Sequence, residues 1–536
     1  MKKSISTLLF YFISVSLFSQ KVYTPDWESL DKRPVPSWFE DAKFGIFIHW
    51  GLYSVPGWSP KGTYSEWYKY WLENKKLMGN GDFTGTEIYD FHTAMYGRDF
   101  TYADFAPMFK AMSYDANEWA KLFERAGARY AVLTTKHHDG FALWPSKEAS
   151  TSYGRPWNSM VIGAHRDLVG EYVDALRKTN IKVGCYFSLR EWGNPLYTKE
   201  TMGLFYEKHF FPQLKDLVNT YKPDLIWSDG PDAINDKEWQ VERTLAWLYS
   251  ESPVKDSVVV NDRWANNTGR KHGDYYTREY SNSSASYDKP WEECRGIGLS
   301  FGYNQNEDLE DYTSPKALVL TLVNIVSNGG NLLLDVGPNA NGKIPPIMQE
   351  RLVQMGDWLK VNGEAIYGTR AWVRPCQWTK GNREWKSKEK HDVSGDAILK
   401  QTVDAEPGYA VKEVFFTKKG KNVYAILPAY PKNTIKLKDI RSTGKTKISL
   451  LGSEKKVNWK VASGSTTQSF SSAGEKISIW KFCSGISMEA QIRARARNVN
   501  AGAFPKVREL SGTFGKTFSG RAPDARAIVE SWKIRS

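Results

Sequence analysis

The chain has 536 residues, of which 41% are hydrophobic and 25% charged, and this length predicts at least two domains. Its formal net charge is +13, but much of the excess lies in the C-terminal tail, so nucleic-acid binding has little support. Aromatic residues make up 14%, which suits stacking against sugar rings, although an aromatic-rich core would also account for them.

The N-terminus has the pattern of an export signal. Lys2 and Lys3 precede a short apolar stretch over residues 8–17, and Ser16 and Ser19 are small residues near a cleavage point. The stretch is shorter than the roughly 20 apolar residues of a membrane span, and we find no later candidate. We therefore predict a signal peptide over residues 1–20, no membrane span, and a periplasmic or extracellular protein.

Residues 21–368 alternate strand-like apolar runs with amphipathic helical stretches, which predicts an α/β fold with a (β/α)₈-like, TIM-type barrel. The eight runs are residues 43–51, 129–140, 181–188, 223–230, 257–263, 274–281, 299–303 and 329–338. The clearest helical stretches are residues 116–127, 167–180, 237–250 and 314–328. The helical signal is poor between the fifth and seventh runs, so we expect the outer helices to be incomplete.

Beyond the barrel, residues 369–483 contain short β-type runs, which predict a small antiparallel β-sandwich. Residues 484–536 are rich in Ala, Arg, Gly and Ser without periodicity, and we expect a disordered basic tail. The four cysteines are far apart and indicate no disulfide framework. Cys185, within an apolar run, is expected to be a buried free thiol.

Almost every predicted strand ends on a polar residue, and in a (β/α)₈ barrel these ends form the active-site face. Two carboxyl groups on such a face could serve glycoside hydrolysis, in which one attacks and the other protonates the leaving oxygen. Asp229 is the candidate nucleophile, although an Asp at this position could also cap the following helix. The candidate acids are Glu66, Glu279, Glu292 and Glu293. Of these, the last two are expected to be solvated in a loop.

Three histidines, His49, His137 and His138, follow neighbouring strands. Together with Asp139 they could in principle hold a metal. Adjacent residues of one strand point to opposite sides, however, and no further cluster completes a metal pattern. We predict no metal and no cofactor, and assign the histidines to hydrogen bonding with sugar hydroxyl groups.

A set of nine ordered motifs between residues 44 and 342 resembles the α-L-fucosidases of glycoside hydrolase family 29. They are FGIFIHWGLYSVP (44–56), YSEWY (64–68), TTKHHDGFALW (134–144), CYFS with EW (185–192), WSDG (227–230), VNDRW (260–264), TREY (277–280), SFGYN (300–304) and GGNLLLDVGPNANG (329–342). The resemblance extends from about Trp27 to Ala462. From Ser463 onward the chain does not resemble the closing strands of the family.

The resemblance implies an exo-acting, retaining α-L-fucosidase that needs no metal and acts on a fucosylated oligosaccharide or glycoconjugate. It assigns Asp229 as nucleophile and Glu279 as general acid/base, with Glu66 as the rival acid. The motifs that match the fucose pocket of the family contain His49, Glu66, Trp67, His137, His138, Tyr186, Trp227, Arg263 and Phe301. Two alternatives remain: a non-catalytic fucose-binding protein, and an enzyme that acts on a related sugar such as α-L-galactose.

Overall fold

The computed structural model describes residues 22–74, 84–230, 234–280, 287–386, 395–429, 435–438, 440 and 446–454, with the backbone of residues 476–479. The predicted signal at residues 1–20 and the predicted tail at residues 484–536 lie outside these described residues.

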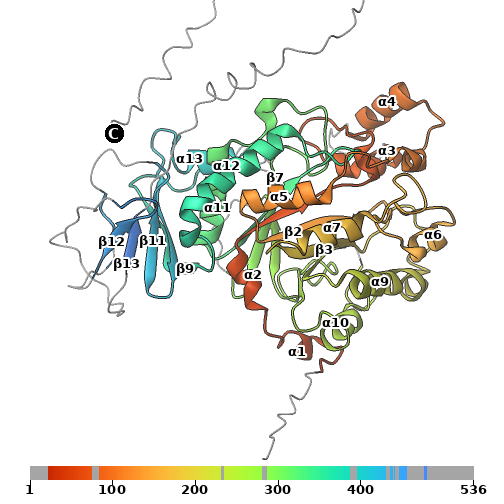
Figure 1. Ribbon diagram of the computed structural model, residues 1–536, viewed down its shortest axis with the longest axis horizontal. Coiled ribbons are helices and arrows are strands. Elements are labelled where there is room, and N and C mark those ends of the chain that lie inside the picture. The colour runs from red at the N-terminus through yellow and green to blue at the C-terminus, as the bar shows by residue number, and fades with distance from the viewer. Residues whose placement is uncertain are drawn as a thin grey trace, which may run out of the picture. The chain divides into compact units, whose positions relative to one another are not determined.

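Eight parallel strands form one curled sheet, and this confirms the (β/α)₈-like fold (Figure 1). The strands are β1 Phe44–Ile48, β2 Tyr130–Lys136, β3 Lys182–Ser188, β4 Leu225–Asp229, β5 Val259–Val260, β6 Tyr276–Glu279, β7 Trp291–Gly296 and β8 Asn331–Val336. Their order is β5-β4-β3-β2-β1-β8-β7-β6, so β1 pairs with both β2 and β8 as in a barrel.

The prediction of the seventh strand at residues 299–303 was wrong. The observed strand β7 is Trp291–Gly296, and all six of its residues are buried. Its sequence WEECRG lacks the apolar run by which the other strands were found, because polar residues of this strand face partners inside the barrel.

The sheet has a seam between β5 and β6, where no backbone ladder joins the two strands within the described residues. One backbone bond, from Asp274 N–H to the Val260 carbonyl at 3.0 Å, crosses the seam together with several side-chain bonds. Asp274 accepts a hydrogen bond of 2.8 Å from Val260 N–H, and Asp262 accepts bonds of 2.9 and 2.6 Å from the N–H and hydroxyl of Thr277. Asp274 is also paired with the buried Arg33 at 3.1 Å. These bonds hold the two strand edges together without a ladder.

Helices pack along the outside of the sheet, and four of them match the helical stretches predicted from the sequence. These are α5 Ala116–Ala126, α7 Leu168–Leu176, α10 Val241–Ser250 and α11 Pro315–Ser327. The remaining α-helices are α1 Trp27–Leu30, α2 Ser37–Ala42, α3 Tyr68–Glu73, α4 Thr84–Tyr96, α6 Lys147–Tyr153, α8 Met202–Phe205, α9 Phe211–Tyr221, α12 Pro346–Asn362 and α13 Asp396–Lys400. Among the described residues no helix separates β5, β6 and β7, so the outer ring is incomplete there, as predicted.

Local sequence accounts for the bounds of these helices. The side chain of Asp115 accepts hydrogen bonds from the first backbone N–H groups of α5, and Gly127 ends the helix in the left-handed region at φ 83°. Short turns of other helix types are η1 Leu52–Ser54, η2 Ser65–Trp67, η3 Tyr102–Met108, η5 Leu309–Asp311 and η6 Gly363–Ala365, with a π-helical turn at η4 Tyr206–Phe210.

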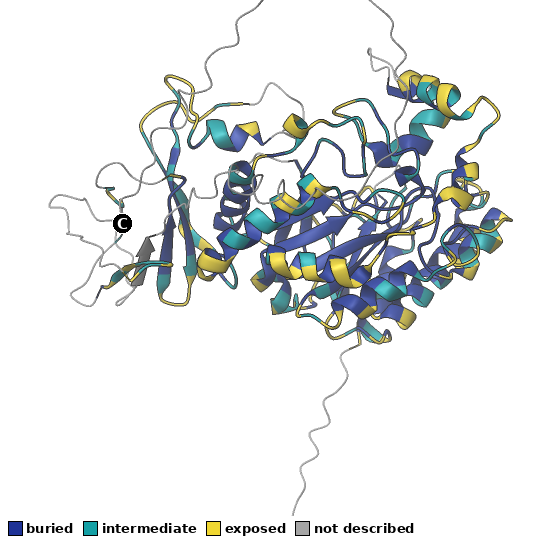
Figure 2. Ribbon diagram, turned by 45° about the horizontal axis from the view of Figure 1, so that its top comes forward, coloured by how far each residue is buried: buried dark blue, intermediate teal, exposed yellow. Residues whose placement is uncertain are grey.

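The central strands are buried on both faces, whereas the helices expose their outer sides (Figure 2). Alternate residues face opposite cores: Ile46 and Ile226 pack in the cluster with the helices, while Phe47, Tyr186 and Trp227 pack in the barrel interior. By this alternation, residues two positions after Phe47 and Trp227 also face the interior. They are His49 and Asp229.

A separate C-terminal sheet has the order β12-β13-β11-β10-β9. Its strands are β9 Arg370–Trp378, β10 Lys412–Lys419, β11 Asn422–Ile426, β12 Ile448–Leu450 and β13 Lys476–Ile479. Strands β9, β10 and β11 are antiparallel, as predicted, but β13 pairs in parallel with both β11 and β12. One apolar face of this sheet packs against Ile435, Leu437 and Ile440.

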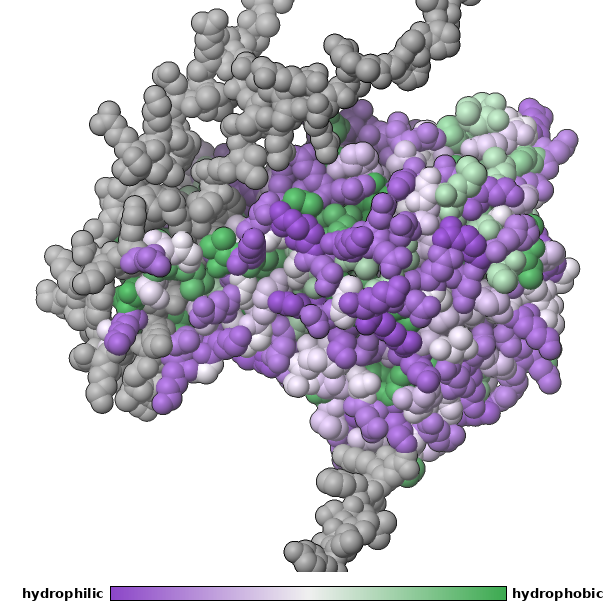
Figure 3. Space-filling model, in the orientation of Figure 1, coloured by the Kyte–Doolittle hydropathy of each residue, from purple (hydrophilic) through white to green (hydrophobic). Residues whose placement is uncertain are grey.

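The surface shown in Figure 3 is mainly hydrophilic, with hydrophobic residues gathered in small groups. Within the described residues, no helix combines the length and apolarity needed to cross a bilayer. Cys185 is a buried free thiol, as predicted, and Cys294 and Cys376 are also free. Cys483 lies outside the described residues.

Candidate active site

Asp229 is the last residue of β4, and its carboxylate faces the mouth of the barrel with 15% of its side chain exposed. Tyr186 donates a hydrogen bond of 2.9 Å to Oδ2. His138 Nε2 lies 3.5 Å from the same oxygen, and a guanidinium nitrogen of Arg263 lies 3.6 Å from Oδ1. Tyr186 on β3 and Arg263 after β5 therefore hold the carboxylate, and His138 lies beside it. Residues 231–233, whose N–H groups an Asp229 helix cap would bond, lie outside the described residues.

Glu279 is the last residue of β6, and 28% of its side chain is exposed. Tyr64 donates a hydrogen bond of 2.8 Å to Oε1, and Arg263 contacts Oε2 at 3.2 Å. Arg263 thus reaches both carboxylates. Its Nε donates to the hydroxyl of Thr277 at 3.0 Å, and its guanidinium lies 4.8 Å from the centre of the Trp227 ring. The structure brings Asp229 and Glu279 to one site, as the sequence predicted.

Glu66 lies in the turn η2 and is 2% exposed. Its Oε2 accepts hydrogen bonds from Gly302 N–H at 2.8 Å and from the hydroxyl of Ser300 at 3.3 Å. Burial raises the pKa of Glu66 to about 7. Its neighbour Trp67 is half-buried and stands edge-on to His138, with ring centres 5.9 Å apart.

His137 and His138 do not point to opposite sides, and that expectation was wrong. Strand β2 ends at Lys136, and Gly140 N–H donates to the His137 carbonyl in a turn, so strand alternation no longer applies. The two rings lie 4.3 Å apart, and His137 stacks on Tyr186 at 5.7 Å and 13°. Burial lowers the pKa of both histidines well below the ordinary value, which favours neutral imidazoles that can hydrogen-bond hydroxyl groups.

Asp335, in β8, forms a hydrogen bond with His49, and its Oδ1 lies 2.6 Å from Nδ1 of the His49 ring. Burial lowers the pKa of His49 to about 3 and raises that of Asp335 well above its ordinary value, so both groups are held in their neutral forms. Phe301 stacks on the His49 ring at 5.0 Å and 25°.

An apolar wall completes the site. Phe301 is 5% exposed and packs between Tyr64 and Tyr280, with ring centres 5.4 and 5.5 Å away. Trp227 stacks on Tyr186 at 5.5 Å and 17°. A sugar that entered this site would meet aromatic carbon on one side and neutral hydrogen-bonding groups on the other.

Glu292 and Glu293 were expected to be solvated, and this was wrong, since both are buried in β7. Glu292 accepts hydrogen bonds from Tyr130 at 2.5 Å and from Trp227 Nε1 at 2.8 Å. Burial raises the pKa of Glu292 to about 7. It supports the base of the site instead of reaching the mouth.

Two supporting residues, Tyr64 and Asp335, were not among the site residues predicted from the sequence. Tyr64 lies within the quoted motif YSEWY, and Asp335 within GGNLLLDVG at the end of β8. A polar residue in an otherwise apolar strand was the available signal for Asp335. Within the described residues, no group of three potential ligands is arranged to hold a metal ion.

Two models of one known protein family match the two parts of the chain. Residues 11–364 match the family model of alpha-L-fucosidase, and residues 409–479 match that of the alpha-L-fucosidase C-terminal domain. The chain is 44% identical to tissue alpha-L-fucosidase of Homo sapiens over 445 residues, which are 82% of this chain and 85% of the relative. The second match reaches residue 479, where β13 pairs with β11, so the expectation that likeness ends at Ala462 was wrong.

Two solved structures illustrate the range of similarity. The alpha-fucosidase of Thermotoga maritima, in complex with a mechanism-based inhibitor, shares 37% identity with a TM-score of 0.62, over 79% of this chain and 90% of that one. A family 29 alpha-L-fucosidase of Bacteroides thetaiotaomicron shares 28% identity with a TM-score of 0.52, over 63% and 77%. The barrel, its carboxylate site and these relatives together show that the chain is a glycoside hydrolase of the α-L-fucosidase family, glycoside hydrolase family 29.

Proposed function

We propose that this enzyme hydrolyses terminal α-L-fucosyl residues by double displacement, with Asp229 as nucleophile and Glu279 as general acid/base. The observation that carries the proposal is the contact of one guanidinium, that of Arg263, with both carboxylates at the mouth of the barrel. Two carboxyl groups near one sugar-binding site are the equipment that glycoside hydrolysis requires.

In the first step an oxygen of Asp229 attacks C1 of the fucosyl group, and the bond from C1 to the leaving oxygen breaks. Glu279 gives its proton to that oxygen, so the aglycone departs as an alcohol and a β-fucosyl ester of Asp229 remains. In the second step Glu279 takes a proton from water while the water oxygen attacks C1. The ester bond breaks, α-L-fucose is released, and both carboxyl groups return to their starting states.

The surroundings of the two groups fit these separate roles. Asp229 receives a hydrogen bond from Tyr186 and is half as exposed as Glu279, which suits a carboxylate that is aimed by its neighbours. Glu279 is the more exposed group and lies at the edge of the seam, where it can exchange protons with water. Glu66 is fully enclosed by the backbone at Gly302 and by Ser300, which suits a residue that binds a sugar hydroxyl.

The proposed substrate is a fucosylated oligosaccharide or glycoconjugate. A structure of the Thermotoga maritima relative has fucose bound. In this chain Phe301 and Trp227 form an apolar wall that suits the C5 methyl group of fucose and disfavours the additional hydroxyl of α-L-galactose.

The direct test is an assay with an aryl α-L-fucoside, monitored by NMR as the first sugar product appears. Release of the α-anomer supports double displacement, and release of the β-anomer would exclude it. Binding without turnover would instead favour the fucose-binding alternative. The aryl α-L-galactoside, tested alongside, should be hydrolysed more slowly.

We also propose that the enzyme is exported, because residues 1–20 have the composition of a signal peptide. Expression of the full chain in a bacterial host, followed by N-terminal sequencing of the exported protein, tests this. A protein that keeps residues 1–20 and stays in the cytoplasm would contradict it.

A further inference from the structure

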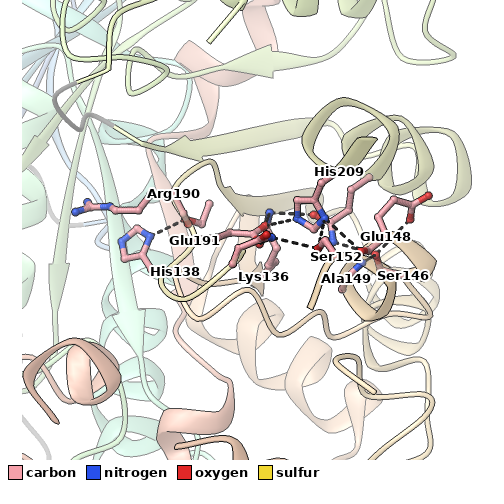
Figure 4. Close-up of polar contacts among 12 residues, drawn as sticks. Lys136, His138, Ser146, Glu148, Ala149, Ser152, Arg190, Glu191 and His209 are labelled. Atoms are coloured by element: carbon pink, nitrogen blue, oxygen red, sulfur yellow. Dashed lines mark hydrogen bonds and ion pairs between the residues drawn. The ribbon is translucent and has the colours of Figure 1, made fainter. Parts of the chain in front are cut away.

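A fully buried polar cluster lies behind the active-site histidines (Figure 4). The side chains of Lys136, Glu191 and His209 have no exposed surface. Lys136 donates to the carboxylate of Glu191, and His209 Nε2 lies 2.7 Å from the same oxygen. Asn194 donates to the other oxygen of Glu191 at 2.7 Å, and Lys136 also donates to Gln213 at 2.9 Å.

The ionised form of Glu191 is well supported. Burial alone would raise the pKa of Glu191, but the positive charges and hydrogen bonds of His209 and Lys136 lower it to about 2. Lys136, Glu191 and His209 each have a hydrogen-bond partner within the cluster. The proposed catalytic steps use none of these three residues. Burying a charge pair costs desolvation free energy and requires good hydrogen-bond geometry. The positions of Lys136 and Glu191 therefore call for an explanation.

A register shift in β2 gives Lys136 its position. Thr134 pairs with Tyr186 of β3, but Lys136 pairs with the next residue, Phe187, so one extra residue is accommodated between them. Without the shift, Lys136 would face the barrel interior with Val132 and Thr134. With it, the side chain crosses over the Phe187 ring, 3.9 Å from its centre, and reaches the helix side.

Lys136 and Glu191 are each adjacent in the chain to residues of the active site or of its surroundings. Lys136 immediately precedes His137 and His138, and Glu191 immediately precedes Trp192, whose N–H donates to the carbonyl of His138 at 2.6 Å. The ion pair thus joins the segment after β2 to the segment after β3.

The second segment also orients the His138 ring. Ser188 directs its hydroxyl proton to the carbonyl of Arg190 at 2.6 Å, so the 2.6 Å contact between Ser188 and His138 Nδ1 requires a proton on Nδ1. The neutral imidazole then has its lone pair on Nε2, the atom that lies 3.5 Å from Asp229. In this state His138 accepts a hydrogen bond at the site and does not donate one.

We propose that the buried Lys136–Glu191–His209 cluster is a positioning site: it clamps the segments after β2 and β3 together and thereby holds His138 as a hydrogen-bond acceptor beside Asp229. The kinetic consequence rests on the proposed function. Because the clamp acts through His138, loss of the clamp should lower kcat/KM only while the His138 imidazole is present.

A double-mutant cycle tests this coupling. The paired change Lys136→Met and Glu191→Gln removes both members of the Lys136–Glu191 ion pair together. We expect it to lower kcat/KM for an aryl α-L-fucoside by about 10- to 100-fold. This is the range found when a residue that orients a metal-binding side chain is lost, and we use it as the scale for the orientation of His138. In a His138→Ala background the same paired change should cost less than about 3-fold, because the orientation of the imidazole no longer counts.

The control is Leu352→Ala in α12, a buried apolar truncation far along the chain from the cluster. It should lower the melting temperature but leave kcat/KM within about 2-fold at 25 °C, and its effect should multiply with that of His138→Ala. Asn194→Ala removes one donor to Glu191 and serves as a milder second variant if the paired change does not fold. It should be coupled to His138→Ala in the same sense.

The outcomes separate the two proposals. Turnover by the unchanged enzyme tests the proposed function, and the cycle tests the clamp. If the losses from the paired change, or from Asn194→Ala, multiply with that of His138→Ala, the cluster serves stability alone. An NMR measurement of selectively ¹⁵N-labelled histidine adds a direct readout: a proton on Nε2 of His138 in place of Nδ1 would overturn the assigned orientation.

Discussion

Tyr64 donates a hydrogen bond of 2.8 Å to Glu279, although the two residues are 215 positions apart in the chain. The loop after β1 thereby reaches the end of β6 and holds one oxygen of the proposed acid, while Arg263 holds the other. Glu66 lies in the same loop as Tyr64 but is enclosed by Gly302 and Ser300. This difference in partners is the structural basis for preferring Glu279 as the acid.

Replacement of Tyr64 by Phe should slow hydrolysis of substrates with poor leaving groups. The phenol group bonds the carboxyl that we propose as the acid, and loss of this hydrogen bond should lower kcat/KM by about 10-fold. The matched control is Tyr68→Phe, four residues after Tyr64 in the chain. It removes a buried hydroxyl group that is hydrogen-bonded to His92. The control should stay within about 2-fold. Equal effects of the two changes on all substrates would argue against a role for Tyr64 in positioning.

Asp229→Ala should reduce turnover by at least about 1,000-fold while the fold is kept, because among the described residues Asp229 is the carboxylate at the end of β4. Added azide should react from the face that Asp229 occupied and give the β-fucosyl azide. Asp224→Asn is the control, since Asp224 lies at the opposite end of the same strand and bonds Lys182 at 2.7 Å. A rate for Asp229→Ala within about 10-fold of the unchanged enzyme would show that the nucleophile is elsewhere.

Glu279 and Glu66 can be distinguished by the leaving group. Loss of the acid should slow natural glycans far more than activated aryl fucosides, because a poor leaving group needs the proton most. Loss of a residue that binds only the sugar should slow both substrates by similar factors. Glu279→Ala should therefore show the steep dependence, and azide should rescue it with formation of the α-fucosyl azide.

The same variants set the outcome that would reverse the assignment. If Glu66→Ala shows the steep dependence and the azide rescue while Glu279→Ala does not, the two roles are exchanged. A crystal structure adds a geometric criterion, since retaining enzymes place their two carboxyl groups about 5–5.5 Å apart.

Burial of Glu66 predicts a specific pH dependence of stability. Its pKa is about 7 in the folded protein against 4.5 ordinarily, so between these values the folded state holds a proton that the unfolded state has lost. The stabilisation is complete below about pH 4.5 and is lost as the pH rises to about 7. Glu66→Gln cannot lose a proton, so its stability relative to the unchanged enzyme should rise across this window.

Chemical denaturation at pH 4.5 and pH 7.5 measures the difference, which should be on the order of 3 kcal/mol. Glu118→Gln, at a carboxyl with 65% of its side chain exposed, is the control. An unchanged difference between Glu66→Gln and the parent at the two pH values would contradict the protonated, buried state.

The seam between β5 and β6 predicts that Asp262 supports catalysis from a distance. Asp262→Ala removes the acceptor for both donors of Thr277, two residues before Glu279, and should cost about 2–4 kcal/mol of stability. It should also lower kcat, because Thr277 of β6 loses its bonds to the segment after β5 that carries Arg263. Asp167→Ala, which removes the cap of α7 and a bond from Tyr221, is the control. A similar loss of stability from both changes, with no loss of kcat from either, would show that the seam does not position Glu279.

The sequence by itself determined the strands that are apolar throughout and the residues at their ends. β1 to β4 and β8 are largely buried on both faces, so each contains an apolar run, such as FGIFI in β1 and LLL in β8, beside which polar residues stand out. Asp229 and His49 could be placed at the mouth of the barrel for this reason. The four outer helices could be predicted because their apolar residues recur with the helical period.

Only the tertiary structure decided where polar side chains inside the protein find partners. β7 was missed because Glu292 is buried by bonds to Tyr130 and Trp227, which lie 162 and 65 positions away. His137 and His138 meet at the site because a register shift and a turn replace the strand alternation that the sequence implied. Such pairings depend on contacts between distant segments, and a local sequence pattern carries no information about which distant group will satisfy a buried charge or hydrogen bond.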